Sequence, residues 1–220
     1  MTETQARQEI CRVGKSLFDR GYVHATAGNI SVRLDDGFLI TPTDACLGFL
    51  EPAQLAKVDL KGQQLSGAAA SKTLVLHRRI YEAHAALANA PRCVVHTHST
   101  HCVALTLQDP QGELLPPITP YFVMKVGHVP VVPYHRPGAP EAGDAVAACI
   151  ARHAAQGTPL RAVMLTRLGP NVWHDSPAQA MAVLEELEET ARLWLLAQPR
   201  PKPLDVRALE ELERVFGCRW

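Results

Sequence analysis

Two histidines one residue apart, His96 and His98, are the residues of this chain whose type and spacing most clearly suggest chemistry. They end an apolar run, RCVVHTHSTH (92–101), that has the composition of a buried strand. In a strand, side chains two residues apart point to the same face, so the imidazoles would lie side by side. Such a pair can bind a metal, and a catalytic zinc site uses three protein ligands with one open position. For an isolated pair, hydrogen-bonded histidines at a strand end are the commoner case.

The length and the charge limit what the chain can do. Its 220 residues suffice for one well-buried domain, or at most two small ones. Lys plus Arg and Asp plus Glu are 22 each, so the formal net charge is zero. No global field is available to hold nucleic acid or an anionic membrane, and we predict neither as a partner. Any anion must be bound locally.

The N-terminal segment and the cysteines indicate a cytoplasmic protein. Residues 1–20 carry charges throughout and place apolar residues at helical spacing, without the hydrophobic core of a signal peptide. No apolar run approaches the roughly 20 residues that a membrane span needs. The six cysteines are scattered without a C-x-x-C pair, which is typical of reduced core thiols.

The first half of the chain alternates helical and strand patterns. We expect a helix over 1–20, a Gly-Asn turn into a strand at 28–34, a strand from 37 that ends in the TPT turn, a short helix from 51 followed by a strand at 58–60, a helix over 71–87 and a strand over 92–99.

The second half continues this alternation. We expect an extended segment at 128–138, a helix over 140–155, two strands within 161–174 joined by a turn at Gly169-Pro170, and a long helix that begins at a Ser176 capping box and runs to 198. Residues 1–198 would form one α/β domain. Residues 199–220 would form a C-terminal arm with a short amphipathic helix, which either packs on a neighbouring subunit or is solvated.

Five segments together resemble the class II aldolase/adducin family over nearly the whole length: AGNIS (27–31), TPTDACLG (41–48), LSGAAASKTLVLH (65–77), VVHTHSTH (94–101) and LTRLGPNV (165–172). The resemblance implies an α/β fold of a single domain, with a central, mostly antiparallel sheet flanked by helices. It also implies a homo-oligomer, commonly a tetramer with active sites at subunit boundaries.

Three further segments look most like the branch of this family that decarboxylates 3-oxo-tetronate 4-phosphates: YFVMKVGHVPVVPYHRPG (121–138), CLG (46–48) and LEELEETA (184–191). The reaction of this branch yields dihydroxyacetone phosphate and carbon dioxide. The substrate is then a sugar-acid phosphate.

The resemblance assigns roles to particular residues. His96 and His98 match the H-x-H pair that binds a divalent metal, usually zinc, one per chain. Five residues match the positions that hold the substrate phosphate: Gly28, Asn29, Thr43, Ser71 and Lys72. Backbone N–H groups in glycine-containing turns, with hydroxyls and an ammonium group nearby, can bind an anion in a chain without net charge.

Three positions depart from the family pattern. Leu168 stands where an N-H-G-P turn supplies the third metal-binding histidine, and leucine cannot bind a metal. Thr73 replaces the acid-base glutamate, and its hydroxyl does not titrate near neutrality. Asp44 replaces a glycine; its carboxylate would either repel a phosphate or cap a turn, which is the commoner role of Asp.

Substitutes for these missing groups can be sought elsewhere in the sequence. His101, His128, His135 and His174 are the alternatives for a third ligand, and His101 qualifies only if the chain bends after His98. Water or Tyr121 would serve as the proton donor. Because carbon dioxide leaves without prior removal of a proton, decarboxylation tolerates the loss of a base better than aldol cleavage does.

Four interpretations stay open at this point. The branch resemblance favours a metal-dependent decarboxylase, a carboxy-lyase of carbohydrate metabolism. A sugar-phosphate aldolase of the same family is the second. The third is a non-catalytic family member that acts as a binding or assembly module, which the changes at Thr73 and Leu168 would permit. The fourth is a chain deliberately altered at these two positions.

Overall fold

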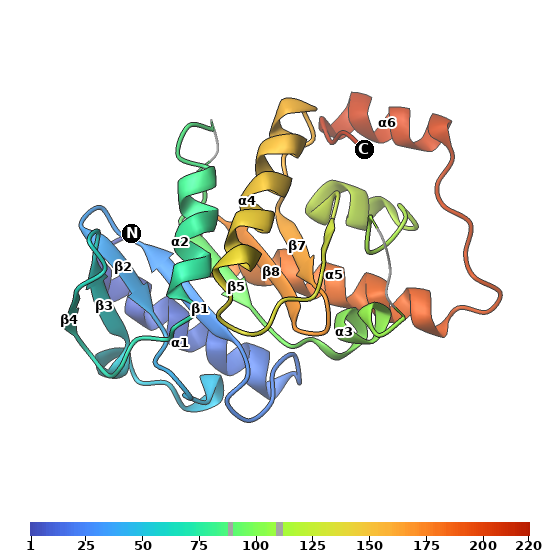
Figure 1. Cartoon of the computed structure of the whole chain (residues 1–220). Coiled ribbons are helices and arrows are strands. Elements are labelled where there is room, and N and C mark those ends of the chain that lie inside the picture. Colours follow the sequence, from blue (N-terminus) through green and yellow to red (C-terminus); the bar gives the residue numbers. More distant parts are fainter. Residues whose placement is uncertain (88–89, 109–111) are drawn as a thin grey trace.

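A central sheet with helices on both faces organises the chain (Figure 1). In the computed structural model, the described residues, 1–87, 90–108 and 112–220, form one sheet of eight strands in the order β4-β3-β2-β1-β5-β8-β7-β6. All neighbouring strands are antiparallel except the parallel pair of β6 and β7. The predicted single α/β domain with a mostly antiparallel sheet is confirmed.

The elements are α-helices, strands, the short 3-10 helices η1 and η2, and the π-helix η3. The first half contains α1 (Glu3–Asp19), β1 (Asn29–Arg33), β2 (Gly37–Ile40), η1 (Leu47–Phe49), η2 (Pro52–Gln54), β3 (Ala56–Asp59), β4 (Gln64–Ser66), α2 (Leu74–Ala83) and β5 (Cys93–His96). The second half contains α3 (Thr100–Thr106), η3 (Phe122–Val126), β6 (Val131–Val132), α4 (Pro140–Ala155), β7 (Ala162–Leu165), β8 (Gly169–His174), α5 (Pro177–Leu196) and α6 (Val206–Phe216).

Polar side chains begin the long helices where the sequence places them. The Thr2 hydroxyl accepts a hydrogen bond from the Gln5 backbone at the start of α1. The Ser176 hydroxyl does the same for Gln179 at the start of α5, as the capping pattern predicts. Within the described residues, no helix combines the length and the apolar character needed to cross a bilayer.

The sheet separates two apolar cores, and this separation decides which way the candidate site faces. On one face, side chains of α1 and α5 such as Ile10 and Leu187 pack with Val95. On the other face, side chains of α2 and α4 such as Ile80 and Val146 pack with Val94. Because side chains alternate along a strand, His96 shares the α2/α4 face with Val94.

The structure corrects several predicted boundaries near the site. The strand that carries the histidines ends at His96, not at 99, because the chain turns there into the unpredicted helix α3. The second helix begins at Leu74 rather than at residue 71, after a turn. The helix η3 was not predicted either.

The turn between β7 and β8 also differs from its prediction. It lies at 166–168, where Arg167 has a left-handed φ of 62°, and Gly169 already belongs to β8. A Cβ atom at Gly169 would lie 1.9 Å from the backbone oxygen of Thr97. Only glycine therefore permits this close approach of β8 to the segment that follows β5.

Candidate functional site

His96 and His98 lie together as neutral imidazoles. Their ring centres are 5.1 Å apart. The Nδ1–H of His96 donates to the backbone oxygen of Pro170 at 2.9 Å, which leaves a lone pair on Nε2. Burial lowers the pKa of His96 to about 4, and burial followed by the charge of His24 lowers the pKa of His98. Uncharged imidazoles with a free nitrogen are what a divalent metal requires, so both side chains fit as ligands.

A third ligand is not supplied at the position where the family pattern places it. Leu168 ends the turn that leads into β8 and is half-buried against the α2/α4 core. The following residue, Gly169, lies against Thr97 and His98, so Leu168 is next to the histidine pair. Across the part of the chain that the structure describes, no group of three or more His, Cys, Asp or Glu side chains could hold a metal.

Other histidines do not join the pair in this structure. His101 lies in α3, and its Nδ1 meets the Glu188 carboxylate at 2.8 Å. His128 stacks on Trp220 with 4.4 Å between ring centres. His174 pairs with Cys93 at the opposite end of β5 from His96, and His135 follows β6, beyond β8 and β7. The imidazole that does approach is His24, whose ring centre is 6.4 Å from that of His98 and which the sequence interpretation missed.

The predicted phosphate-binding segments meet around Thr41. Its hydroxyl accepts from the backbone N–H of Ile30 at 3.2 Å, and its backbone oxygen accepts from the N–H of Ser71 at 3.2 Å. The Thr43 hydroxyl donates to the backbone oxygen of Ala70 at 2.9 Å. The residue before β1, Gly28, has a left-handed φ of 86°. The structure thereby brings 28–29, 41–43 and 71–73 together.

Individual side chains in these segments differ in exposure. Thr43 and Lys72 are exposed, whereas Asn29 is buried. Asp44 is exposed and has a left-handed φ of 54°, a backbone conformation that Asp tolerates in turns. The site thus offers one ammonium group and several hydroxyl and amide groups to an anion.

The two residues considered for acid-base chemistry occupy different places. Thr73 immediately precedes α2, and its hydroxyl lies 2.8 Å from that of Ser71. Tyr121 is exposed and precedes η3, whose Phe122 packs in the α1/α5 core. Since that core lies on the other face of the sheet from His96, the single chain does not bring Tyr121 to the histidine pair.

A row of polar residues crosses the sheet at His96, and sequence reasoning missed its extent. Asn29 on β1 pairs with His96, and His96 pairs with Asn171 on β8. Asn171 is fully buried, as is His77 on α2. An amide inside the otherwise apolar segment GPNVWH was the signal available in the sequence.

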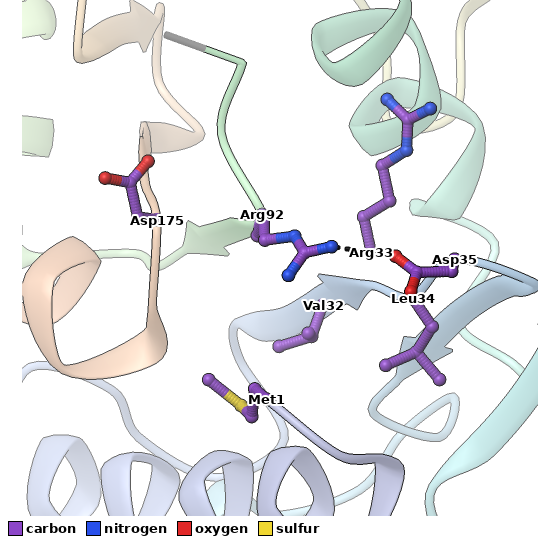
Figure 2. Close-up of a pocket in the computed structure, with 7 residues that line it drawn as sticks. All are labelled: Met1, Val32, Arg33, Leu34, Asp35, Arg92 and Asp175. Carbon is purple, nitrogen blue, oxygen red and sulfur yellow. Dashed lines mark hydrogen bonds and ion pairs between the residues drawn. The ribbon is translucent and has the colours of Figure 1, made fainter.

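A small cavity lies far from this row (Figure 2). Arg92, at the start of β5, forms an ion pair of 2.8 Å with Asp35 there. The cavity volume of about 30 Å³ admits a water molecule but no sugar-acid phosphate. It lies at the opposite ends of β1 and β5 from Asn29 and His96, so it is not the candidate site.

Comparison with known proteins finds a matching family and relatives that are similar over nearly the whole chain. Residues 8–195 match the family described as the Class II Aldolase and Adducin N-terminal domain. A 3-oxo-tetronate 4-phosphate decarboxylase of Cupriavidus necator is 54% identical, over 100% of this chain and 99% of that protein. A protein of the same name from Escherichia coli K12 is 42% identical over 90% of both chains.

A solved structure shows the same similarity in three dimensions. The crystal structure of YgbL from Klebsiella pneumoniae, described as an aldolase/epimerase/decarboxylase, superposes with a TM-score of 0.83 at 41% identity. The match covers 96% of this chain and 99% of that chain.

Proposed function

This chain belongs to the class II aldolase and adducin family, and on that premise we propose that it decarboxylates a 3-oxo-tetronate 4-phosphate to dihydroxyacetone phosphate and carbon dioxide. It is an enzyme, a carboxy-lyase. The observation that carries this function is the convergence, at one end of the sheet, of a neutral histidine pair with the three segments around Thr41. The full-length similarity to decarboxylases selects the reaction within the family.

We propose that the two ends of the substrate are held by different groups. Backbone N–H groups near Gly28 and Thr43, the Ser71 hydroxyl and the Lys72 ammonium group bind the phosphate. Enzymes of this family are metal-dependent, and His96 and His98 would hold a divalent ion, generally zinc, with water or substrate in the remaining positions. When bound, the ion supplies Lewis-acid polarisation of the ketone.

Decarboxylation requires few catalytic groups from the residues of the chain. The electron pair of the bond to the carboxylate carbon moves toward the polarised ketone as carbon dioxide departs, and an enediolate results. No base has to remove a proton first, which is consistent with Thr73 at the position of the family's glutamate. A proton must then be delivered to C2 to complete dihydroxyacetone phosphate. Aldol cleavage would require the titrating group that Thr73 lacks.

The direct test is carbon dioxide release from 3-oxo-tetronate 4-phosphate, measured with zinc content on protein purified without a chelator or histidine tag. We expect turnover that chelators abolish and zinc restores. His96→Gln should lose both zinc and turnover, whereas His174→Gln, at the far end of the sheet and on its opposite face, should retain them. Metal-free and metal-loaded wild-type protein that both fail to release carbon dioxide would contradict the proposal and favour a non-catalytic module.

A thermal assay separates the enzyme from a scaffold independently. A ligand that binds only the folded state raises the melting temperature by an amount that grows with the logarithm of ligand concentration over Kd. We expect dihydroxyacetone phosphate to stabilise the metal-loaded protein more than the metal-free one. Equal melting temperatures with and without this ligand would favour the scaffold.

We also propose that the protein assembles as a homotetramer and is located in the cytoplasm. A homotetramer follows from the family resemblance, and the exposed apolar residues of α6 are consistent with a subunit contact. A cytoplasmic location is proposed because the six scattered cysteines are typical of reduced thiols.

A further inference from the structure

Four buried polar atoms beside His96 have no hydrogen-bond partner. Among the described residues, the unpartnered buried side-chain atoms include Asn29 Oδ1, His77 Nε2, and both Nδ2 and Oδ1 of Asn171. The exposed fraction is 7% for Asn29 and 0% for the other two side chains. Buried polar groups are almost always hydrogen-bonded, so four unpartnered atoms on two neighbouring strands and the facing helix indicate a bound polar molecule.

These residues converge on the α2 face of the sheet. Asn29 and Asn171 flank His96 on the neighbouring strands, and side chains in register point to the same face. Ser31, two residues after Asn29, shares that face and contacts His77 on α2. His77 therefore reaches, from α2, the face of the sheet that carries Asn29 and His96.

A chain of hydrogen bonds through Ser31 and Tyr81 can hold the proton of His77 on Nδ1. Tyr81 Oη donates to the backbone oxygen of Ser31 at 3.1 Å. Ser31 Oγ can then donate to Tyr81 Oη at 2.8 Å and accept from Nδ1–H of His77 at 2.8 Å. Every hydroxyl in this chain donates once, and Nε2 of His77 is left with a lone pair. Burial lowers the pKa of His77 to about 3, so the ring stays neutral.

The unpartnered atoms define the chemistry of their ligand. His77 Nε2 and the two amide oxygens, Asn29 Oδ1 and Asn171 Oδ1, need a donor, whereas the Asn171 Nδ2 group needs an acceptor. A cation cannot accept the amide hydrogens, and an anion cannot donate to these acceptors. A water molecule does both, and its size suits a place where each of these atoms is enclosed.

We propose that Asn29, His77 and Asn171 bind a water molecule behind His96, which accepts from the Asn171 amide and donates to His77 Nε2 and Asn29 Oδ1. After carbon dioxide has left, the O–H that donates to Asn29 Oδ1 turns to C2 and gives its proton there. The donor role rests on the proposed function. It answers the loss of the glutamate, because His77 on α2 lies four residues after Thr73, the residue that precedes this helix, and therefore on the same side of it. Side chains on a helix lean toward its N-terminus, so His77 points toward the turn that carries Thr73.

Water is the only co-reactant that the proton transfer needs. The electron pair left on C2 forms the new C–H bond as an O–H bond of the water breaks. The hydroxide that remains accepts a hydrogen bond from the Asn171 amide and regains a proton from solvent. His77 and Asn171 are positioning residues that act through the water.

The fate of the enediolate provides a readout that a structural role would not change. Without prompt protonation, this intermediate eliminates its phosphate and yields methylglyoxal and inorganic phosphate. The ratio of inorganic phosphate to dihydroxyacetone phosphate therefore measures protonation separately from carbon dioxide release. Positioned proton donors contribute roughly 10²–10⁴-fold, so we expect Asn171→Leu to raise this ratio by about tenfold or more.

Two further variants make the test specific. His77→Asn keeps an amide near the position of Nδ1, for Ser31, but removes Nε2; His77→Gln places an amide near Nε2. We expect the ratio of inorganic phosphate to dihydroxyacetone phosphate to rise in His77→Asn and to rise less in His77→Gln. The matched control is Val163→Ala, which changes an apolar neighbour of Asn171 in the same row and should leave the ratio unchanged.

Melting temperature tests the water site without any turnover. If a water satisfies Asn171, Asn171→Leu breaks a complete network and lowers the melting temperature. If the amide is unsatisfied, removing it is neutral or stabilising, which would overturn the water site. An unchanged phosphate ratio in both Asn171→Leu and His77→Asn, with carbon dioxide still released, would overturn the donor role. Wild-type protein that releases no carbon dioxide would refute the proposed function and the donor role, while the melting comparison still decides the water site.

Discussion

At His96, one hydrogen bond to a backbone oxygen decides which ring nitrogen is free. The carbonyl of Pro170 can only accept, so the proton lies on Nδ1 and the lone pair on Nε2. A second imidazole 5.1 Å away completes a pair suited to a metal, while Leu168 adds bulk without a donor atom. Two protein ligands hold zinc less firmly than three, which makes the residue at 168 the natural place to test the site.

Restoring a ligand should tighten metal binding. We expect Leu168→His to retain more zinc per chain than wild type after dialysis against a competing chelator, because a third imidazole joins the pair. Leu168→Asn serves as the control, since it adds polarity at the same place without an imidazole. Equal zinc retention in the wild type and the histidine variant would show that residue 168 does not face the metal.

The neutral, buried His77 should make stability depend on pH. Its pKa is lowered from 6.5 to about 3 by burial, so in acid the unfolded chain takes up a proton that the folded chain does not. The free energy of unfolding should therefore fall as the pH decreases from 6.5 toward 3, by up to about 1.4 kcal/mol per pH unit from this group. Urea unfolding of wild type and His77→Asn across this range should show a shallower slope for the variant. Parallel slopes would contradict the assignment.

At the scale of elements, a carboxylate from α5 fixes the start of α3. Glu188 is buried and accepts hydrogen bonds from the backbone N–H groups of His101 at 2.9 Å and Cys102 at 3.0 Å. Free N–H groups at a helix start favour a negative charge. The segment that carries His98 runs directly into this helix, so Glu188 ties the histidine pair to α5.

Loss of this carboxylate should cost stability and loosen the site. We expect Glu188→Ala to lower the free energy of unfolding by about 1–3 kcal/mol, because buried N–H groups lose their acceptor. Zinc retention should fall as well. Glu189→Ala, an exposed neighbour in the same helix, should change the stability by less than about 0.5 kcal/mol. Similar unfolding curves for the two variants would contradict a capping role.

At the scale of the whole molecule, the C-terminal segment contacts the rest of the protein through Trp220, whereas α6 is exposed along its length. Trp220 stacks on His128 and lies 5.8 Å from the ring of Phe122. Helix α6 buries none of its residues and leaves Val206, Val215 and Phe216 exposed. An amphipathic helix whose apolar side chains face water is suited to a contact between subunits.

Charging this surface should weaken assembly. If the chain is a homotetramer that uses α6, Phe216→Asp should lower the mass measured by light scattering or sedimentation at a given concentration. Arg207→Asp, a change of charge at an exposed position of the same helix, is the control and should preserve the mass. Wild-type protein that sediments as a monomer would contradict the assembly itself.

Local patterns in the sequence determined much of the architecture. The capping box at Ser176 marks the start of α5, and apolar periodicity predicts α1, α2 and α4. These signals depend on neighbours a few residues apart, so they can be interpreted without the fold. The family motifs also identified His96 and His98, and the enzyme class that goes with them.

Only the tertiary structure decided how distant residues meet. Helix α3 escaped the sequence because its start depends on Glu188, 87 positions from His101. The row from Asn29 through His96 to Asn171 exists only because β1 and β8 flank β5. Strand register and helix packing are set by long-range burial, which no local pattern records. The composition of the site came from the sequence, whereas its neighbours, its free nitrogen and its enclosed polar atoms came from the fold.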